Sequence, residues 1–152
     1  MKLVEGVHYI GVQDWNIKDF HGLYTPRGGS YNSYLILDGK IALIDAVNRE
    51  FFDELIGNVS RIVDPEKIDY VVMNHAEPDY SGALSLLMKK AKNAKIIATK
   101  KGKDYLSKYY KALWQQSWEF ISVKEGEEIS LGKTQRKNRY CFWSLWLERW
   151  CC

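Results

Sequence analysis

Residues 74 to 82 read Asn74-His75-Ala76-Glu77-Pro78-Asp79-Tyr80-Ser81-Gly82, and they follow the apolar, strand-like segment 68–73. An imidazole and two carboxylates stand at alternate positions of this run. In an extended segment, residues two apart project to the same side, so His75, Glu77 and Asp79 can converge on one pocket if the loop curls. The proline and the final glycine allow such a turn. The run therefore predicts part of a metal site.

The residue types narrow the choice of ion. One imidazole with two carboxylates is a mixed nitrogen and oxygen set, which suits iron, manganese or zinc better than copper(I) or an iron–sulfur cluster. Without a cation the two carboxylates would repel each other, and this would raise the pKa of one of them. Each pKa unit corresponds to roughly 1.4 kcal/mol. The plain alternative is that Asp79 and Ser81 cap a helix while His75 and Glu77 are solvated. Iron or zinc is the expected ion.

The rest of the body alternates strand-like and helix-like segments. Strands are expected at 4–12, 30–37, 41–47, 68–73 and 94–99, with a hairpin of 119–123 and 128–131; helices are expected at 49–63, after a cap at Ser81, and at 101–113. This order implies parallel strands with helices on a face, joined to an antiparallel edge. The fold class is therefore α/β (α+β), with the metal motif at the carboxyl end of a strand.

Composition limits the function classes. The chain has 152 residues, 46% of them hydrophobic, which is enough for one domain. No segment has the roughly 20 apolar residues of a membrane span, and the first residues lack the apolar run of a signal peptide, so a cytoplasmic protein with no membrane contact is expected. Residues 136–152 hold four basic side chains and one acid, which equals the whole net charge of +3. With residues 1–135 neutral overall, no basic patch for nucleic acid is expected.

Residues 134–152 are expected to be an aberrant tail. They contain all three cysteines and three of the six tryptophans. One interpretation is an aromatic helix at a membrane surface, with Trp143, Trp146 and Trp150 at helical spacing. A cysteine metal or redox site is another, although Cys141 and the final Cys-Cys pair match no usual ligand spacing. The favoured interpretation is a segment that is out of frame or comes from a junction.

Two stretches carry a resemblance to a known family. The stretch from His21 to Ile36 and the run 74–82 together resemble the N-terminal metallo-β-lactamase-like domain of flavodiiron proteins. In the wider superfamily the motif is His-x-His-x-Asp-His, and Glu77 in place of the second histidine marks the flavodiiron branch. The resemblance covers residues 1–133 and implies a partial αββα sandwich, mainly its first half. The flavodoxin-like FMN domain of the family is expected to be absent.

The resemblance also implies an activity. Flavodiiron proteins are cytoplasmic oxidoreductases that reduce dioxygen to water, nitric oxide to nitrous oxide, or both, at a non-haem diiron centre that receives electrons through FMN. Their electron donor is rubredoxin or a reduced flavin or deazaflavin system, and they form homo-oligomers. By position, His75 and Glu77 would bind one iron and Asp79 the other. His21 and Tyr24 would line the pocket.

Two departures from the family pattern limit what one copy of the chain can do. Tyr80 stands where many members have a further histidine that binds iron. The iron at this position would therefore carry water or an open coordination position instead. After Lys133 the chain has no histidine and no aspartate to supply the remaining ligands. The chain is therefore expected to be a fragment that is inactive alone and leaves one face of its sheet uncovered.

Three other interpretations stay open. A zinc-dependent hydrolase of the metallo-β-lactamase class is disfavoured by Glu77. A non-catalytic interaction module would use the aromatic tail to bind a partner. A second chain could also donate the missing ligands.

Overall fold

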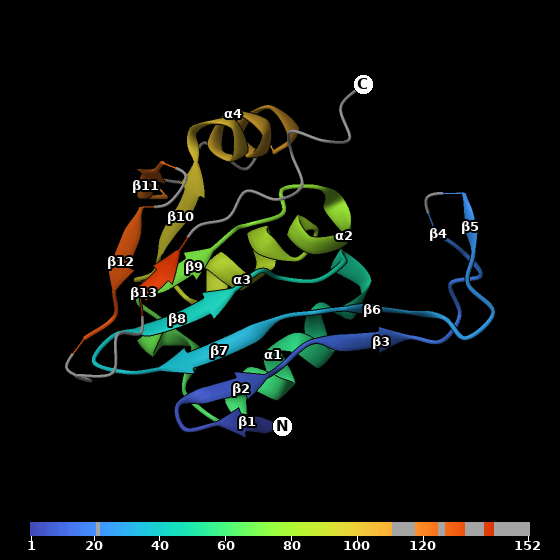
Figure 1. The fold of residues 1–152 in the computed structure, drawn as a ribbon, viewed down its shortest axis with the longest axis horizontal. Helices are drawn as coiled ribbons and strands as arrows, with labels where there is room; N and C mark the ends of the chain where they lie inside the picture. The colour runs from blue at the N-terminus through green and yellow to red at the C-terminus, as the bar shows by residue number, and fades with distance from the viewer. Residues whose placement is uncertain (21, 111–117, 125–126, 133–138, 142–152) are drawn as a thin grey trace.

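The centre of the molecule is a seven-stranded mixed sheet. The computed structural model describes residues 1–20, 22–110, 118–124, 127–132 and 139–141 (Figure 1). In spatial order the sheet contains β1 (Lys2–Val4), β2 (Val7–Tyr9), β7 (Tyr34–Leu37), β8 (Ile41–Ile44), β9 (Tyr70–Val72), β10 (Lys95–Thr99) and β11 (Phe120–Val123). The strands β1 to β8 pair antiparallel and β8 to β11 pair parallel. The predicted parallel half with an antiparallel edge is confirmed.

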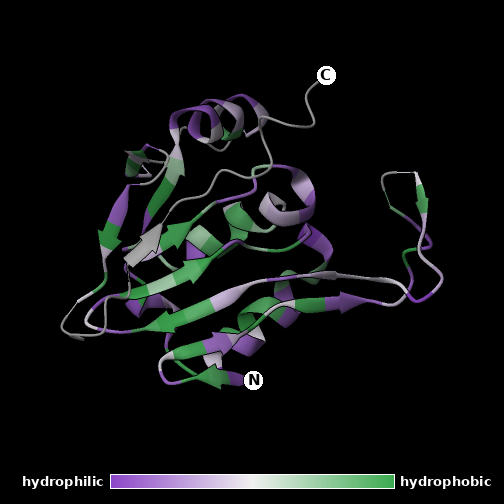
Figure 2. Ribbon diagram, in the orientation of Figure 1, coloured by the Kyte–Doolittle hydropathy of each residue, from purple (hydrophilic) through white to green (hydrophobic). Residues whose placement is uncertain are grey.

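Helices cover one face of this sheet. They are η1 (Arg49–Phe51), α1 (Phe52–Ser60), η2 (Pro65–Lys67), α2 (Pro78–Ser81), α3 (Leu84–Lys90) and α4 (Lys100–Tyr109). The main core joins Leu55 of α1, Leu87 of α3 and Leu106 of α4 to Leu43 and Ile96 of the sheet. Figure 2 shows the central strands and the inward sides of these helices as the hydrophobic part of the fold. No helix in the described ranges is both long and apolar enough to cross a membrane.

The opposite face of the sheet carries two smaller clusters. Because side chains alternate along a strand, Val72 and Ile97 point away from the helices, as does Ala42. Leu131 and Ile129 pack against this face, and Ile129 belongs to the strand β12 (Glu128–Ser130). The exposed fraction is 7% for Val72 and 0% for Ile97 and Ala42. The expected uncovered face is therefore not found at these residues.

The expected hairpin of 119–123 and 128–131 is wrong. The strand β11 pairs in parallel with β10, where its backbone satisfies the open edge of the sheet. The strand β12 pairs instead with β13 (Arg139–Cys141), which lies inside the segment expected to be an aberrant tail. The other residues of that segment, including its three tryptophans, lie outside the described residues, as do residues 111–113 of the expected last helix.

The N-terminal strands are shorter than the sequence pattern indicates. The expected strand 4–12 is divided among β1, β2 and β3 (Val12–Asp14), and 30–37 is divided between β6 (Gly29–Tyr31) and β7. The pair β3–β6 leads away from the sheet to a two-stranded hairpin of β4 (Asp19–Phe20) and β5 (Leu23–Tyr24). We call residues 15–28 the arm. Its hairpin lies to one side of the sheet (Figure 1), and Phe20 of the hairpin packs against the main core.

Candidate metal centre

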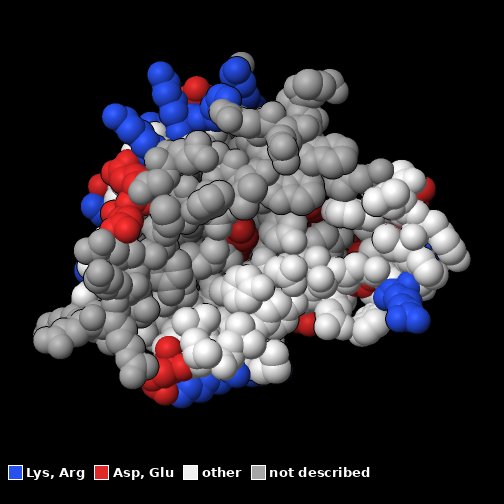
Figure 3. All heavy atoms as spheres, in the orientation of Figure 1, with Lys and Arg blue, Asp and Glu red and all other residues white. Residues whose placement is uncertain are grey.

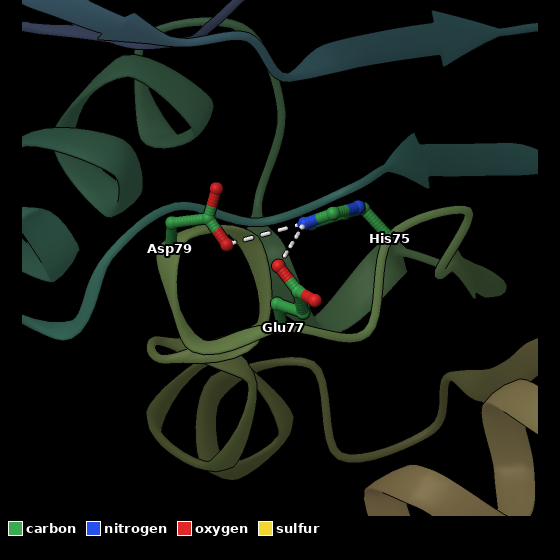
Figure 4. A group of neighbouring side chains, drawn as sticks. All are labelled: His75, Glu77 and Asp79. Atoms are coloured by element: carbon green, nitrogen blue, oxygen red, sulfur yellow. Dashed lines mark ion pairs between the residues drawn. The ribbon is translucent and has the colours of Figure 1, made fainter. Parts of the chain in front are cut away.

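Three side chains converge just beyond the end of β9. His75 and Glu77 lie on the loop after this strand, and Asp79 lies in the first turn of α2. Figure 4 shows the three side chains directed toward one another. The Nε2 atom of His75 lies 3.2 Å from Oδ1 of Asp79 and 3.4 Å from Oε2 of Glu77. One ligand atom from each residue fits within 4.8 Å of the other two, so the structure brings together the three residues that the sequence predicted as ligands.

The His75 ring nitrogen is buried without a hydrogen bond. Its Nε2 atom is near both carboxylates, yet neither contact has hydrogen-bond geometry. The Asp79 carboxylate raises the pKa of His75, outweighing burial, which acts in the opposite direction, and Glu77 adds to the rise. A buried polar atom without a partner is unusual in a protein, and a cation between the three side chains would satisfy it.

Asp45 holds the start of the loop, and sequence reasoning missed it. This residue follows β8 in a left-handed conformation with φ of 54°. Its Oδ1 atom accepts hydrogen bonds from the backbone N–H groups of Asn74 at 2.8 Å and His75 at 3.1 Å. Burial raises the pKa of Asp45 to about 6. An aspartate directly after a strand that pairs in parallel with β9 is the signal that could have identified it.

Ser81 and Gly82 hold the other end. The buried Ser81 hydroxyl donates to the Ala76 carbonyl oxygen at 2.8 Å, and the Tyr110 hydroxyl lies 2.9 Å from it. Ser81 is the last residue of α2, so the expected cap is wrong; α3 begins three residues later. A Cβ atom on Gly82 would lie 2.7 Å from the Arg49 nitrogen, so glycine permits the close approach of α2 to η1. The loop is fixed at both ends.

The Tyr80 ring packs beside His75. It meets the His75 ring edge-on, with centroids 5.1 Å apart and an interplanar angle of 76°. Its hydroxyl accepts a weak hydrogen bond of 3.5 Å from the Asn32 backbone N–H. Burial raises the pKa of Tyr80, so the phenol is neutral at neutral pH. A neutral phenol is a poor metal ligand.

The two residues expected to line the pocket have different outcomes. Tyr24 lies on β5 in the arm with 78% of its surface exposed, and Figure 1 shows this hairpin well apart from α2. The structure therefore does not bring Tyr24 to the metal group. His21 lies outside the described residues.

The mixed sheet, with three side chains that could hold a metal ion after a parallel strand, has the arrangement expected of a β-lactamase-like domain. Residues 30–139 match the family model described as ODP family beta lactamase. The chain belongs to this family.

Relatives of the chain carry flavodiiron and reductase names. The chain is 40% identical over 134 residues to a rubredoxin-oxygen oxidoreductase of Megalodesulfovibrio gigas, covering 87% of this chain and 32% of the relative. It is 40% identical over 133 residues to a nitric oxide reductase of Moorella thermoacetica, and the match covers 86% of this chain and 33% of that protein. The crystal structure of the flavodiiron protein from Giardia intestinalis matches with a TM-score of 0.80 and 34% identity, covering 87% and 32%. The chain thus spans about a third of the length of these proteins. The predicted resemblance to flavodiiron proteins is confirmed.

Proposed function

We propose that this chain supplies part of the diiron centre of a flavodiiron oxidoreductase that reduces dioxygen, nitric oxide or both. The observation that carries the proposal is the buried Nε2 atom of His75, which has no hydrogen bond and lies between two carboxylates. The names of the relatives, a rubredoxin-oxygen oxidoreductase and a nitric oxide reductase, support the reaction class.

The residues present fit iron. His75, Glu77 and Asp79 would hold it, and one nitrogen with two oxygen donors suits non-haem iron. When bound, the metal would supply electrons and charge stabilisation to a diatomic substrate. Asp45 would keep the His75 backbone in place, and the Tyr80 ring would exclude water from one side of the imidazole. The Glu77 side chain, 39% exposed, is the most accessible of the three ligands.

The remaining parts of the enzyme belong to the same proposal. An FMN cofactor, a rubredoxin-type or reduced-flavin donor, a cytoplasmic location and a homo-oligomer are supported by the resemblance to flavodiiron proteins. We also keep residues 1–133 as the metal domain and 134–152 as a tail. The described residues offer one metal-ligating group of three side chains, so the chain alone is expected to bind iron incompletely and not to turn over.

Iron binding by the whole chain tests the proposal. The 152-residue protein would be loaded anaerobically with Fe²⁺ or Zn²⁺, and bound metal would be measured by mass spectrometry beside esterase and lactamase assays. His75→Ala and Asp79→Asn should weaken iron binding at least about tenfold, because the first removes a ligand and the second removes the negative charge of one. Glu66→Gln is the matched control, since Glu66 is an exposed carboxylate paired with Lys92 at 3.0 Å.

Two results would contradict the proposal. The first is iron binding that is unchanged in His75→Ala. The second is a preference for zinc together with hydrolase activity, which would favour the metallo-β-lactamase-like hydrolase instead.

A further inference from the structure

The neutral body of the chain is strongly polarised. Residues 89–110 contain eight lysines and a single aspartate, a balance of +7. Residues 1–88 contain seven basic and thirteen acidic side chains, a balance of −6. In Figure 3 the lysine side chains gather over α4. The neutral overall charge of the body therefore conceals a local excess of lysines, while the expectation of no nucleic-acid partner stays a prediction.

The outward side of α4 combines lysines with tyrosines. Gly102, Leu106 and Tyr110 are buried at a spacing of four residues, which directs the opposite side of the helix to solvent. That side carries exposed residues that we call the α4 face: Lys100, Lys101, Asp104, Tyr105, Lys108 and Tyr109. Two lysines elsewhere in the basic segment are already paired, Lys92 with Glu66 and Lys95 with Glu119. Within the described ranges, neither Lys100 nor Lys108 forms an ion pair.

Tyr105 and Tyr109 form the aromatic centre of the face. Their side chains are 38% and 55% exposed, which is high for such large rings. The rings stack, with centroids 6.1 Å apart and an interplanar angle of 9°. Tyrosine is enriched at the energetic centres of protein interfaces because it offers a large contact area and one polar atom.

We infer that the α4 face is a docking surface for a protein with an acidic surface patch. The exposed lysines attract negative charge and orient the encounter, and the tyrosine pair provides contact area. This inference is independent of the proposed reaction. It rests on α4, whose outward side is not used by the His75 group.

A protein fits the α4 face better than a nucleic acid does. A helix of 10 residues is about 15 Å long, which is too short to follow many phosphates. The excess of acids in residues 1–88 would also repel a longer phosphate chain.

Binding of a short fluorescent peptide of aspartate, glutamate and phenylalanine to the full chain tests the inference. Its neutral counterpart, with asparagine and glutamine, should not bind. Lys100→Glu with Lys108→Glu, and separately Tyr105→Ser with Tyr109→Ser, should each weaken binding at least about tenfold. The control pair, Arg27→Glu with Lys67→Glu, makes the same charge change outside residues 89–110. It should alter the affinity for the acidic peptide less than about twofold.

Circular dichroism melting would verify that each variant folds, and Lys100→Gln with Lys108→Gln offers a milder change. The inference is overturned if the control pair weakens binding as much as the lysine pair, or if the tyrosine pair has no effect. It is also overturned if single-stranded oligothymidine or phosphatidylserine vesicles bind more tightly than the peptide with the same dependence on the variants. Self-association of the chain through this face would likewise overturn it.

Discussion

The loop 74–82 and the arm 15–28 are both connections between strands, but they are held in different ways. Hydrogen bonds to distant residues fix the loop, from Asp45 at one end and between Ser81 and Tyr110 at the other. The hydrogen bonds of the arm are local, such as that from the Thr25 hydroxyl to the Ile17 carbonyl at 3.0 Å. Hydrogen bonds to distant segments can align three side chains, whereas the described hydrogen bonds within the arm only shape its hairpin.

The largest difference in stability between the two regions is expected when the aspartate that holds each of them is replaced. Asp45→Ala leaves the Asn74 and His75 N–H groups without their acceptor, and should lower the free energy of unfolding by roughly 2 to 3 kcal/mol. Asp19→Ala removes an equivalent acceptor for the Gly22 N–H group in the arm, where water can replace it. Its cost should be less than about 0.5 kcal/mol. Urea unfolding of both variants measures this, and equal losses would show that the arm is as important as the loop.

The second-largest difference in stability is expected between two glycine substitutions, one in each region. Gly82→Ala places a methyl group 2.5 Å from the Pro78 carbonyl oxygen and should cost about 2 kcal/mol through overpacking. Gly22→Ala meets no atom within 4 Å, and its φ of 75° adds only about 1 kcal/mol of local strain. Thermal melting compares the two variants. A Gly22→Ala change that is more damaging than Gly82→Ala would refute the tight packing of the loop.

The pH dependence of the metal-free chain sharpens the same comparison. The pKa of Asp45 is about 6 in the folded state, whereas its ordinary value is 3.8. Between pH 3.8 and about 6 the folded state therefore binds more protons than the unfolded state. The contribution of Asp45 to stability is therefore present below pH 3.8 and is lost as the pH rises through about 6. Relative to Asp45→Asn, the chain should lose roughly 3 kcal/mol across this window, because the two pKa values differ by about two units. Parallel stability curves for the two proteins in the presence of a chelator would contradict this assignment.

The smallest effect is expected in the arm. Trp15 and Tyr24 are 66% and 78% exposed, so Trp15→Ser and Tyr24→Ser should change the free energy of unfolding by less than about 0.5 kcal/mol. Both should leave iron binding unchanged, since the structure places Tyr24 away from the His75 group. Iron titration of Tyr24→Ser decides whether this residue contributes to the site, and weakened binding would restore its expected role.

The sequence predicted those parts of the fold that depend on local pattern. The apolar runs of β8, β9 and β10 identified the parallel strands, and alternation in the run 74–82 identified the three converging side chains. The pairing of β12 with β13 was not predictable, because a short polar strand has no pattern that selects its partner. Asp45 was missed because its role depends on a register between strands 29 residues apart in the chain.

The charge distribution was missed for a different reason. Counting charges over residues 1–135 gives zero, which conceals +7 in residues 89–110 against −6 in residues 1–88. The helical spacing that directs the lysines outward is readable in the sequence once a shorter window is used. The stacking of Tyr105 on Tyr109 required the structure, because spacing alone does not fix the ring orientation.

The two anchors of the loop have a consequence for synthesis of the chain. Asp45 precedes Asn74 by 29 residues and Tyr110 follows Ser81 by 29 residues, so both must be in place before the loop is fully constrained. A nascent chain that has not yet released Tyr110 from the ribosome lacks one anchor of the ligand loop. We expect such a chain to capture iron poorly, so that metal loading follows folding of this segment and premature binding to an unfinished polypeptide is avoided.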